Sequence, residues 1–422
     1  MICYKTEPAT IRDIVAQHAE ETAFLWLLRN NAVKEAHYNL MHLKRLEDRL
    51  EAHLDGLRVA QETGWECALA NLEQFKESGE MFATATLAFE NSNPDYLQTL
   101  YVIAEQTPEA VDGLISALGW VEPEYLQGKV NGLLSSKSPF WRRVGIAACA
   151  IHRVDPKQFL EQALQDEDSA LRSRALKACG ELGRSNLRNM ITPNLAHKDL
   201  DVQFWAAWSL TLLGNRLEAL EALKQFVFTP TNYAEEALRL LCRTQTLAAT
   251  QQLLGTLFKQ HQALRLAIQG AGASGDSRYI PWLIQQMAVP EQARVAGEAF
   301  SLITGVDLAY DDLEMDKPAD FQAGPSEDAD DDNVALDADE NLPWPDPTLL
   351  QEWWQQHQTE FVSGQRYLMG QMITSEQCEH VLKTAMQRQR YAAALELALS
   401  SPAAALFETC AKVSRQKKLL NL

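Results

Sequence analysis

An acidic run near residue 330 holds the side chains that come nearest to a known ligand pattern. Asp328, Asp330 and Asp332 stand at alternate positions, and Asp339 falls where a calcium-binding loop places its twelfth ligand. Such a loop needs glycine at its sixth position for a sharp turn and a bidentate glutamate at its twelfth. This chain has Asn333 and Asp339 there. The pattern therefore favours a solvated acidic surface over a calcium site, and the sequence predicts no bound metal or cofactor.

Histidine and cysteine, which commonly bind metals or act in catalysis, are not arranged for either role. His37 and His42 are five residues apart, so a helix does not place them on one face. Neither HExxH, GxSxG nor a glycine-rich phosphate loop occurs in the chain. Cys149, Cys179 and Cys242 stand in apolar helical stretches without CxxC pairs, as expected for small core residues. The sequence therefore predicts a protein that is not an enzyme.

Acidic and aromatic side chains supply the candidate contacts with a partner. Residues 307–346 carry 15 Asp or Glu and one Lys, which is −14 of the net charge of −19. This balance argues against nucleic acid, whose phosphates need a basic surface. Adjacent Trp353 and Trp354 cannot both face one direction on a helix, so we expect one of them to line a surface, with core packing as the alternative. The predicted protein-binding residues are Asp328, Asp330, Asp331, Asp332, Trp344, Trp353 and Trp354.

The elements that must position these residues repeat at a fixed spacing. Steps of 30 or 31 residues connect one column of positions: Ala148, Ala178, Ser209, Leu240, Gly270 and Phe300. Each unit reads as an apolar helical stretch, a short turn and a second helical stretch. A fixed period of this size is typical of an α-solenoid, in which helical hairpins stack on their neighbours. The sequence thus predicts an all-α solenoid without a β-sheet.

Pattern and composition divide the predicted solenoid into five regions. Apolar residues at steps of three and four over residues 33–57 predict one long amphipathic helix, with Gly64 as a stop. The regions are an N-terminal helical part (1–63), divergent repeats (64–137), regular repeats (138–306), an acidic flexible loop (307–346) and a C-terminal helical cap (347–422). The acidic loop has few apolar groups to bury, so we expect replacement of residues 318–339 to leave the melting temperature nearly unchanged. The stretch GQRYLMGQ reads as a short loop within the cap.

The chain carries no sign of a membrane partner. It has no run of about 18 uncharged apolar residues, as a membrane-spanning helix would need. Its first residues, MICYKTEPATIRDIV, lack the basic stretch and apolar core of a secretory signal. We therefore expect a cytoplasmic protein.

Several stretches resemble a known family. The repeats resemble HEAT-like repeats of the type named after phycobilin lyases. QHAEETAFLW, LKRLEDRLEAHLDGLRVA, GEMFATATLAFE, LPWPDP, WWQQHQTEF and GQRYLMG are similar to a bacterial family of HEAT-like repeat proteins encoded in type VI secretion gene clusters. The resemblance covers nearly the whole chain and implies spike proteins, effectors and their adaptors as neighbours. No activity is assigned to that family, so no catalytic residue is transferred.

Three functions are weighed against these observations. A cytoplasmic adaptor or chaperone for an effector or spike component fits a long solenoid face, and its acidic loop could engage a basic partner or occupy the protein's own groove. An immunity protein that neutralises a toxic effector is the alternative, favoured by acidic charge. A bilin lyase is suggested only by the repeat name, and fold analogy does not license it. If the acidic loop is not the binding site, we expect the concave face of the repeats over residues 156–287 to serve instead.

Overall fold

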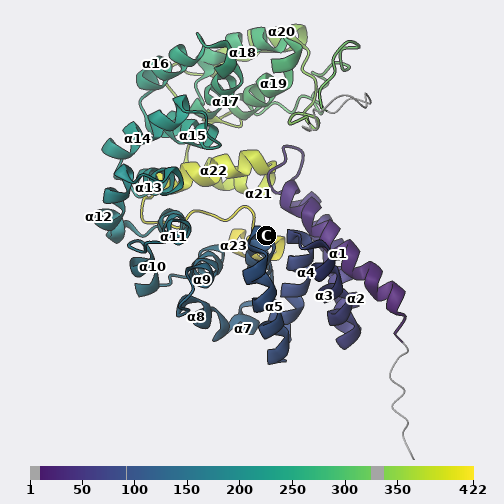
Figure 1. Cartoon of the computed structure of the whole chain (residues 1–422). Coiled ribbons are helices and arrows are strands. Elements are labelled where there is room, and N and C mark those ends of the chain that lie inside the picture. The colour runs from purple at the N-terminus through teal and green to yellow at the C-terminus, as the bar shows by residue number, and fades with distance from the viewer. Residues whose placement is uncertain (1–9, 92, 325–336) are drawn as a thin grey trace, which may run out of the picture. The chain divides into compact units, whose positions relative to one another are not determined.

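A computed structural model describes residues 10–91, 93–324 and 337–422 and divides the chain into two compact units. The first unit contains the chain up to Lys34, Tyr38–Leu182 and Glu408–Leu422, and the second contains Glu35–His37 and Gly183–Phe407. Both units consist mainly of helices (Figure 1). The two units cut across the five regions proposed from the sequence, because the C-terminal residues belong to the first unit and the preceding ones to the second.

In the first unit α1 packs against its three successors, and later helices pack onto α4, α6 and one another. Proline opens α5, α7 and α9, where its missing N–H leaves no helical hydrogen bond unmade. The elements of this unit are α1 (Arg12–Ala32), α2 (Leu40–Val59), α3 (Glu62–Phe75), α4 (Ser78–Glu90), α5 (Pro94–Gln106), η1 (Pro108–Ala110), α6 (Val111–Trp120), α7 (Pro123–Leu126), α8 (Lys129–Leu134), α9 (Pro139–Ile151), α10 (Gln158–Ala163), α11 (Ser169–Glu181) and α23 (Val413–Leu420).

The amphipathic helix near the N-terminus is shorter than predicted. One helix was expected over residues 33–57, but α2 begins only at Leu40. Asn39 is its N-cap, and the Asn39 side chain accepts hydrogen bonds from the backbone N–H groups of Met41 and His42. The apolar residues before Asn39 belong to the turn after α1. Their spacing fits a helix by coincidence, and the helix begins only after the N-cap.

Gly64 also has a different role from the one predicted. It lies inside α3 and does not end a helix. A Cβ atom on Gly64 would stand 2.1 Å from the backbone oxygen of Leu57 in α2. Glycine at this position therefore allows α2 and α3 to approach closely.

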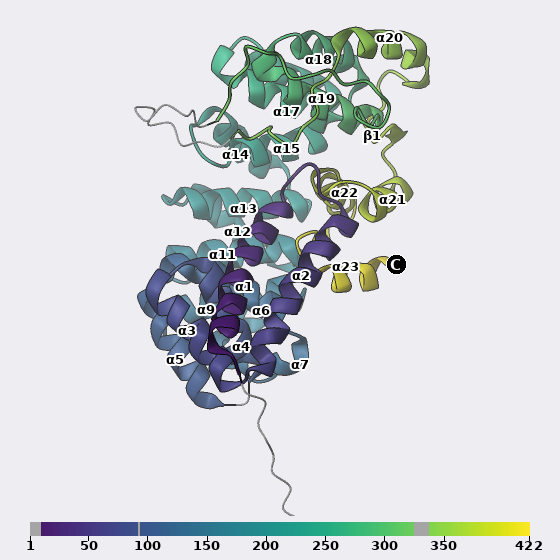
Figure 2. The ribbon, with the colours of Figure 1, turned by 90° about the vertical axis from the view of Figure 1, so that its right-hand side faces the viewer.

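The second unit is built from two layers of helices. In one layer α13, α15, α17 and α19 contact one another in order, and α14, α16 and α18 pack against them; α20 lies against α18 (Figure 2). The elements are η2 (Ser185–Leu187), α12 (Arg188–Ile191), η3 (Thr192–Ala196), α13 (Leu200–Leu212), α14 (Leu217–Phe228), α15 (Ala234–Thr244), α16 (Leu247–Leu257), η4 (His261–Ala263), α17 (Leu264–Ser274), η5 (Ser277–Tyr279), α18 (Ile280–Met287), α19 (Pro290–Thr304), α20 (Pro347–His357), η6 (Gln358–Glu360), β1 (Tyr367–Leu368), β2 (Gln371–Met372), α21 (Ser375–Thr384) and α22 (Gln387–Ser400).

The predicted all-α solenoid is confirmed at the column of repeat positions. Ser209, Leu240 and Phe300 are fully buried in α13, α15 and α19. Gly270 holds the same column in α17, where an added Cβ would stand 2.7 Å from the side chains of both Leu238 and Leu254. The column therefore marks the centre of the layer formed by the first helix of each repeat.

The short loop predicted at GQRYLMGQ is a β-hairpin, so the expectation that the fold holds no β-sheet is wrong at this point. Strands β1 and β2 pair antiparallel, with Leu368 opposite Gln371. The backbone N–H groups of Met369 and Gly370 donate to the carbonyl oxygens of Leu302 and Ile303 in the last turn of α19, at 2.8 and 3.0 Å. Carbonyl groups at a helix end have no partner within the helix, so the hairpin satisfies the end of α19.

Replacing Leu240 with alanine should lower the free energy of unfolding by about 2–5 kcal/mol, because Leu240 is fully buried and the change opens a cavity. Urea unfolding followed by circular dichroism measures the change. Leu217→Ala is the matched control, since Leu217 is 83% exposed. Equal losses in the two variants would mean that the repeat column does not mark the core.

Candidate functional site

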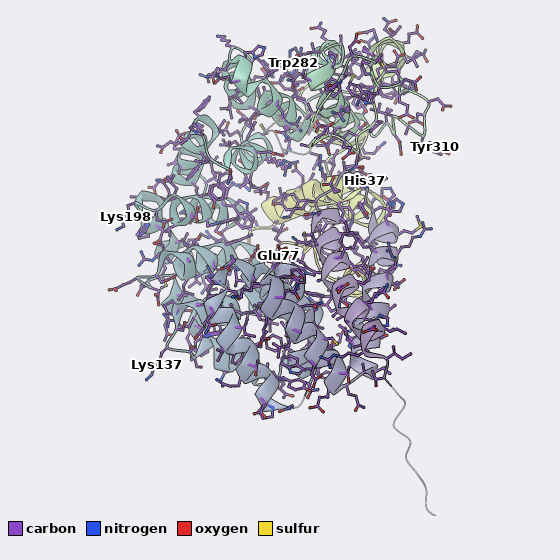
Figure 3. All side chains as sticks on the ribbon, turned by 45° about the vertical axis from the view of Figure 1, so that its right-hand side comes forward. His37, Glu77, Lys137, Lys198, Trp282 and Tyr310 are labelled. Carbon is purple, nitrogen blue, oxygen red and sulfur yellow. The ribbon has the colours of Figure 1, made fainter. Side chains whose placement is uncertain are left out.

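A groove in the second unit is a candidate site for binding a partner. It encloses about 770 Å³, a size typical of ligand-binding clefts. Its walls come from α19, the turn after α19, residues 340–343, the β-hairpin, and helices α21 and α22. Val306, Leu308 and Val381 form part of its apolar floor and are buried, whereas Asp307 and Glu340 are exposed on its rim. His37 also lines the groove, and Figure 3 shows where His37 and Tyr310 lie on this unit.

The acidic residues 337–339 are fixed to the helical layer by two ion pairs. The guanidinium of Arg265 in α17 donates to both carboxylate oxygens of Asp339, each at 2.6 Å. Arg294 in α19 donates to Asp337 at 2.7 Å. Burial raises the pKa of the Asp337 carboxyl, but hydrogen bonds from the Asp339 backbone N–H and from Arg294 outweigh it and leave that pKa lowered. We call these two ion pairs the arginine clasp; they place residues 340–343 as a wall of the groove.

The arginine clasp corrects the expectation that residues up to Asp339 contribute little to folding. Asp339 is only 5% exposed, and removing it would leave Arg265 without its bidentate partner. The same contact bears on the calcium-loop pattern, in which Asp339 stood at the twelfth position. Arg265 takes both oxygens of that carboxylate, so a cation there would have to displace the guanidinium. Asp328, Asp330, Asp331 and Asp332 lie outside the described residues.

Replacing Asp339 with asparagine should lower the free energy of unfolding by about 1–3 kcal/mol, because a charge-assisted bidentate pair of a buried carboxylate is lost. Differential scanning calorimetry at neutral pH would register the loss as a lower melting temperature. Asp320→Asn serves as the control, since Asp320 is exposed and forms no ion pair with a described residue. Equal melting temperatures for both variants would contradict a stabilising clasp.

Trp344 contacts Arg294, one of the two arginines of the clasp. The Arg294 guanidinium lies 4.6 Å from the centre of the Trp344 ring, a cation–π distance. The Phe321 ring packs edge-to-face on Trp344 at 4.8 Å. The Met315 N–H donates to the Trp344 carbonyl oxygen at 2.8 Å, and the Asp346 N–H donates to Leu313 at 3.0 Å. Both described ends of the acidic region therefore pair with each other and with α19.

Trp353 and Trp354 face different surroundings, as adjacent helical residues must. Trp354 is 8% exposed and packs against Phe361. Trp353 is half-buried, stacks on His357 at 4.3 Å and meets Phe300 edge-to-face at 5.5 Å. Neither tryptophan lines the groove, nor does Trp344. A contact of these three side chains with a partner stays a prediction.

Helix α22 covers much of the layer formed by α13, α15, α17 and α19. At its start Arg388 pairs with Glu298 of α19 at 3.1 Å. In the middle the Tyr391 hydroxyl donates to Glu236 of α15 at 2.6 Å, and at its end Arg216 donates to the Leu399 carbonyl at 2.7 Å. The part of the repeat face that lies in this unit, expected as a fallback binding surface, is therefore largely occupied by the chain's own helix.

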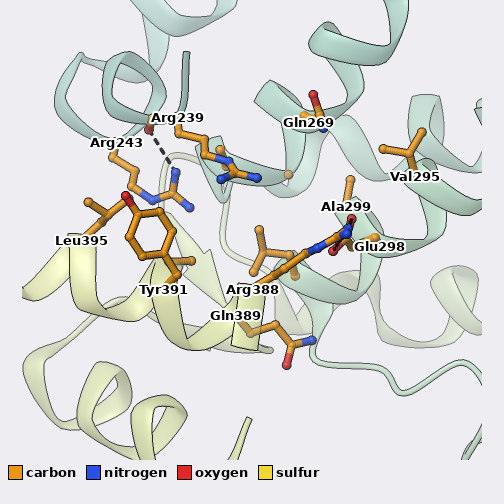
Figure 4. Close-up of a pocket in the computed structure, with 14 residues that line it drawn as sticks. Arg239, Arg243, Gln269, Val295, Glu298, Ala299, Arg388, Gln389, Tyr391 and Leu395 are labelled. Atoms are coloured by element: carbon orange, nitrogen blue, oxygen red, sulfur yellow. Dashed lines mark hydrogen bonds and ion pairs between the residues drawn. The ribbon is translucent and has the colours of Figure 1, made fainter. Parts of the chain in front are cut away.

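A buried charge network holds α22 in place. Glu396 of α22 is 8% exposed and pairs with Arg366, which precedes β1, and with Arg243 of α15. Arg366 also donates to the carbonyl oxygens of Ser274 and Arg243, at 2.8 and 3.2 Å. Burial lowers the pKa of Arg243, opposed by Glu396. The adjoining cavity shown in Figure 4 encloses only about 70 Å³, too little for a substrate.

Metal-ligating clusters and reactive thiols are two kinds of catalytic feature. No cluster of three or more His, Cys, Asp or Glu side chains suited to a metal ion occurs among them. Cys149, Cys179 and Cys242 are buried as expected, and burial raises the pKa of Cys149 to about 11 and that of Cys242 to about 12. Such thiols stay protonated near neutral pH and are poor nucleophiles. Within the same residues, no helix is both long and apolar enough to cross a membrane.

Sequence reasoning missed the arginines that organise this site. Arg265 and Arg294 are each the one cation of a repeat helix, α17 and α19, and a lone cation there signals a buried counter-charge. The signal does not identify the acid that pairs with each arginine. Asp339 lies 74 residues after Arg265, and Asp337 lies 43 residues after Arg294. The groove has no local pattern at all, since its walls come from several separate segments.

Comparisons with known proteins agree with the repeat architecture. A family model described as HEAT repeats matches residues 156–235. No curated protein sequence matches the chain significantly. Among solved structures, the chain is similar to an engineered protein crystallised by the Northeast Structural Genomics Consortium, at 14% identity over 69% of this chain and 95% of that one. The TM-score of 0.29 is too low to support an argument. Residues 156–235 are similar to HEAT repeats, and the chain has an all-α solenoid fold.

Proposed function

We propose that this protein is a non-enzymatic cytoplasmic adaptor or chaperone that holds an effector or spike component of a type VI secretion apparatus. HEAT repeats generally serve as protein–protein interaction scaffolds. The observation that carries the proposal is the groove of about 770 Å³, with its apolar floor and exposed acidic rim. The secretion context rests on the resemblance of stretches such as WWQQHQTEF and GQRYLMG.

Affinity purification of the tagged chain from its native cell, followed by mass spectrometry, tests the proposal. We expect a secretion effector or spike component to copurify and to form a defined complex when both proteins are purified. Deleting the gene should stop secretion of that effector without killing the cell. Normal secretion in the deletion strain, with no copurifying secretion component, would refute the adaptor role.

An immunity protein remains the second candidate, because exposed acidic side chains without a cationic partner would attract a basic toxin. Asp307 and Glu340 are two such side chains on the groove rim. The two functions differ in the deletion strain. Loss of an immunity protein should make the cell sensitive to the toxin, whereas loss of an adaptor should leave the cell viable.

We also propose that the acidic residues 328 and 330–332 and the three tryptophans contribute to this partner contact. Neutralising Asp328, Asp330, Asp331 and Asp332 together should slow association, because charges at an interface rim act mainly on encounter. Trp353→Ala should speed dissociation, since the partial exposure of Trp353 leaves it available as an aromatic anchor. Stopped-flow association and surface plasmon resonance with the purified partner separate these two effects.

A further inference from the structure

The groove combines an apolar floor with an acidic rim. Its floor is apolar: the partly exposed side chains of Pro343, Met369 and Met386 line it above the buried Val306, Leu308 and Val381. Its rim carries the exposed carboxylates of Asp307 and Glu340, and neither forms an ion pair with a described residue. Burying apolar surface favours binding without direction, whereas unpaired carboxylates favour a cation at a fixed place. The occupant must offer both.

The surroundings of the groove strengthen the negative charge. The turn that begins at Asp307 continues with Asp311, Asp312 and Glu314, all exposed. Arg388, a cation that lines the groove, pairs with Glu298. His37 and His380 also line the groove. Clefts lined by one sign of charge concentrate the opposite charge.

An exposed aromatic side chain follows the groove-lining residues Asp307, Leu308 and Ala309 in the chain. Tyr310 is 84% exposed, and its backbone N–H donates to the Asp307 carboxylate at 3.2 Å. An aromatic face next to a carboxylate suits a guanidinium or ammonium group, which can stack on the ring while it pairs with the acid. Figure 3 shows the labelled Tyr310 side chain at the edge of the second unit.

We propose that this groove binds a segment of the partner protein in which arginine or lysine lies beside large apolar side chains. This inference rests on the proposed function and names the chemistry of the partner at that site. The apolar side chains of the segment fill the floor, and its cation lies between Tyr310 and the carboxylates of Asp307 and Glu340. The arginine clasp contributes by holding the wall of residues 340–343 in place.

Three short labelled peptides and the purified full chain test the proposal by fluorescence anisotropy. One peptide alternates leucine and arginine, the second alternates alanine and arginine, and the third alternates leucine and glutamate. We expect the dissociation constant of the leucine–arginine peptide to be about tenfold lower than that of either of the others. Equal binding of the alanine–arginine peptide would show attraction by charge alone, and equal binding of the leucine–glutamate peptide would show a merely apolar surface. Either result overturns the proposal.

Variants then locate the binding. Asp307→Asn with Glu340→Gln should weaken the leucine–arginine peptide about tenfold, and asparagine can still accept the hydrogen bond from Tyr310. Ala309→Arg, at an exposed position of the groove wall, should weaken it further by placing a cation in the path. Glu291→Gln with Glu352→Gln removes the same charge from exposed positions away from the groove and should change nothing. Equal affinities for the groove variant and this control would refute the site.

The same variants separate this inference from the adaptor role. If the wild-type chain and the Ala309→Arg variant capture the secretion partner equally well, the groove assignment fails while the adaptor role stands. If neither captures a secretion component but the leucine–arginine peptide still binds in the groove, the adaptor role fails and the groove chemistry stands.

Discussion

Replacing Glu396 with alanine should lower the free energy of unfolding of the second unit by about 3–5 kcal/mol. Glu396 is 8% exposed and is the shared anion of Arg243 and Arg366, whose side chains are 4% and 21% exposed. Removing the carboxylate leaves two cations close together in a region of low solvent access. Their desolvation is then uncompensated, and like charges at short range repel each other.

Urea unfolding measures this loss, and the control is Glu379→Ala on α21. Glu379 is exposed, so its removal should change stability by no more than about 0.5 kcal/mol. The effect should extend to the groove, because Glu396 fixes α22, and α22 contributes Arg388 and Gln389 to the groove wall. A folded Glu396→Ala variant should therefore bind the leucine–arginine peptide more weakly. A loss of stability below about 1 kcal/mol would mean that the network does not hold α22.

The repeat architecture was readable from the sequence because it depends on local pattern. Each inner helix places the same column at its centre, and Leu240, Gly270 and Phe300 are all buried there. The break at Asn39 was missed because apolar residues before it continued the helical spacing by coincidence. Capping depends on the Asn39 side chain reaching two backbone N–H groups, and the apolar pattern does not contain that information.

The candidate site was less readable because its parts meet only in three dimensions. A charge of −14 over residues 307–346 predicted a solvated loop, and that reasoning treats every carboxylate alike. Asp337 and Asp339 differ from their neighbours only because Arg294 and Arg265 lie within reach in the folded chain. The hairpin after residue 364 was missed for a similar reason, since its strands are short and depend on the carbonyl groups at the end of α19.

The second large effect is expected in the first unit, where Glu47→Ala should also lower the free energy of unfolding by about 3–5 kcal/mol. Glu47 of α2 is 3% exposed and accepts hydrogen bonds from Arg29 of α1, at 3.2 and 3.0 Å, and from the Val413 N–H at 2.8 Å. Arg29 is itself 6% exposed and also donates to the carbonyl oxygens of Cys410 and Ala411. Losing Glu47 leaves the buried Arg29 without its counter-charge and the Val413 N–H without its acceptor, so the C-terminal residues should detach first.

Limited proteolysis and urea unfolding test this expectation together. In Glu47→Ala the residues after Glu408 should become sensitive to protease at urea concentrations that leave the wild type intact. The exposed Glu20 on α1 provides the control, and Glu20→Ala should leave both measurements unchanged. The double variant Arg29→Met with Glu47→Leu should recover part of the lost stability, because no buried charge then lacks a partner.

The pH dependence gives an independent check on Glu47. Burial raises the pKa of this carboxyl above its usual 4.5, although Arg29 and the Val413 N–H oppose the shift. A raised pKa means that the folded chain holds the proton more tightly than the unfolded chain. The contribution of Glu47 to stability is therefore largest below about 4.5 and falls as the pH rises through the pKa of the folded chain. Relative to the double variant, the wild type should lose stability over that interval, and an opposite slope would show that Arg29 more than compensates for the burial of Glu47.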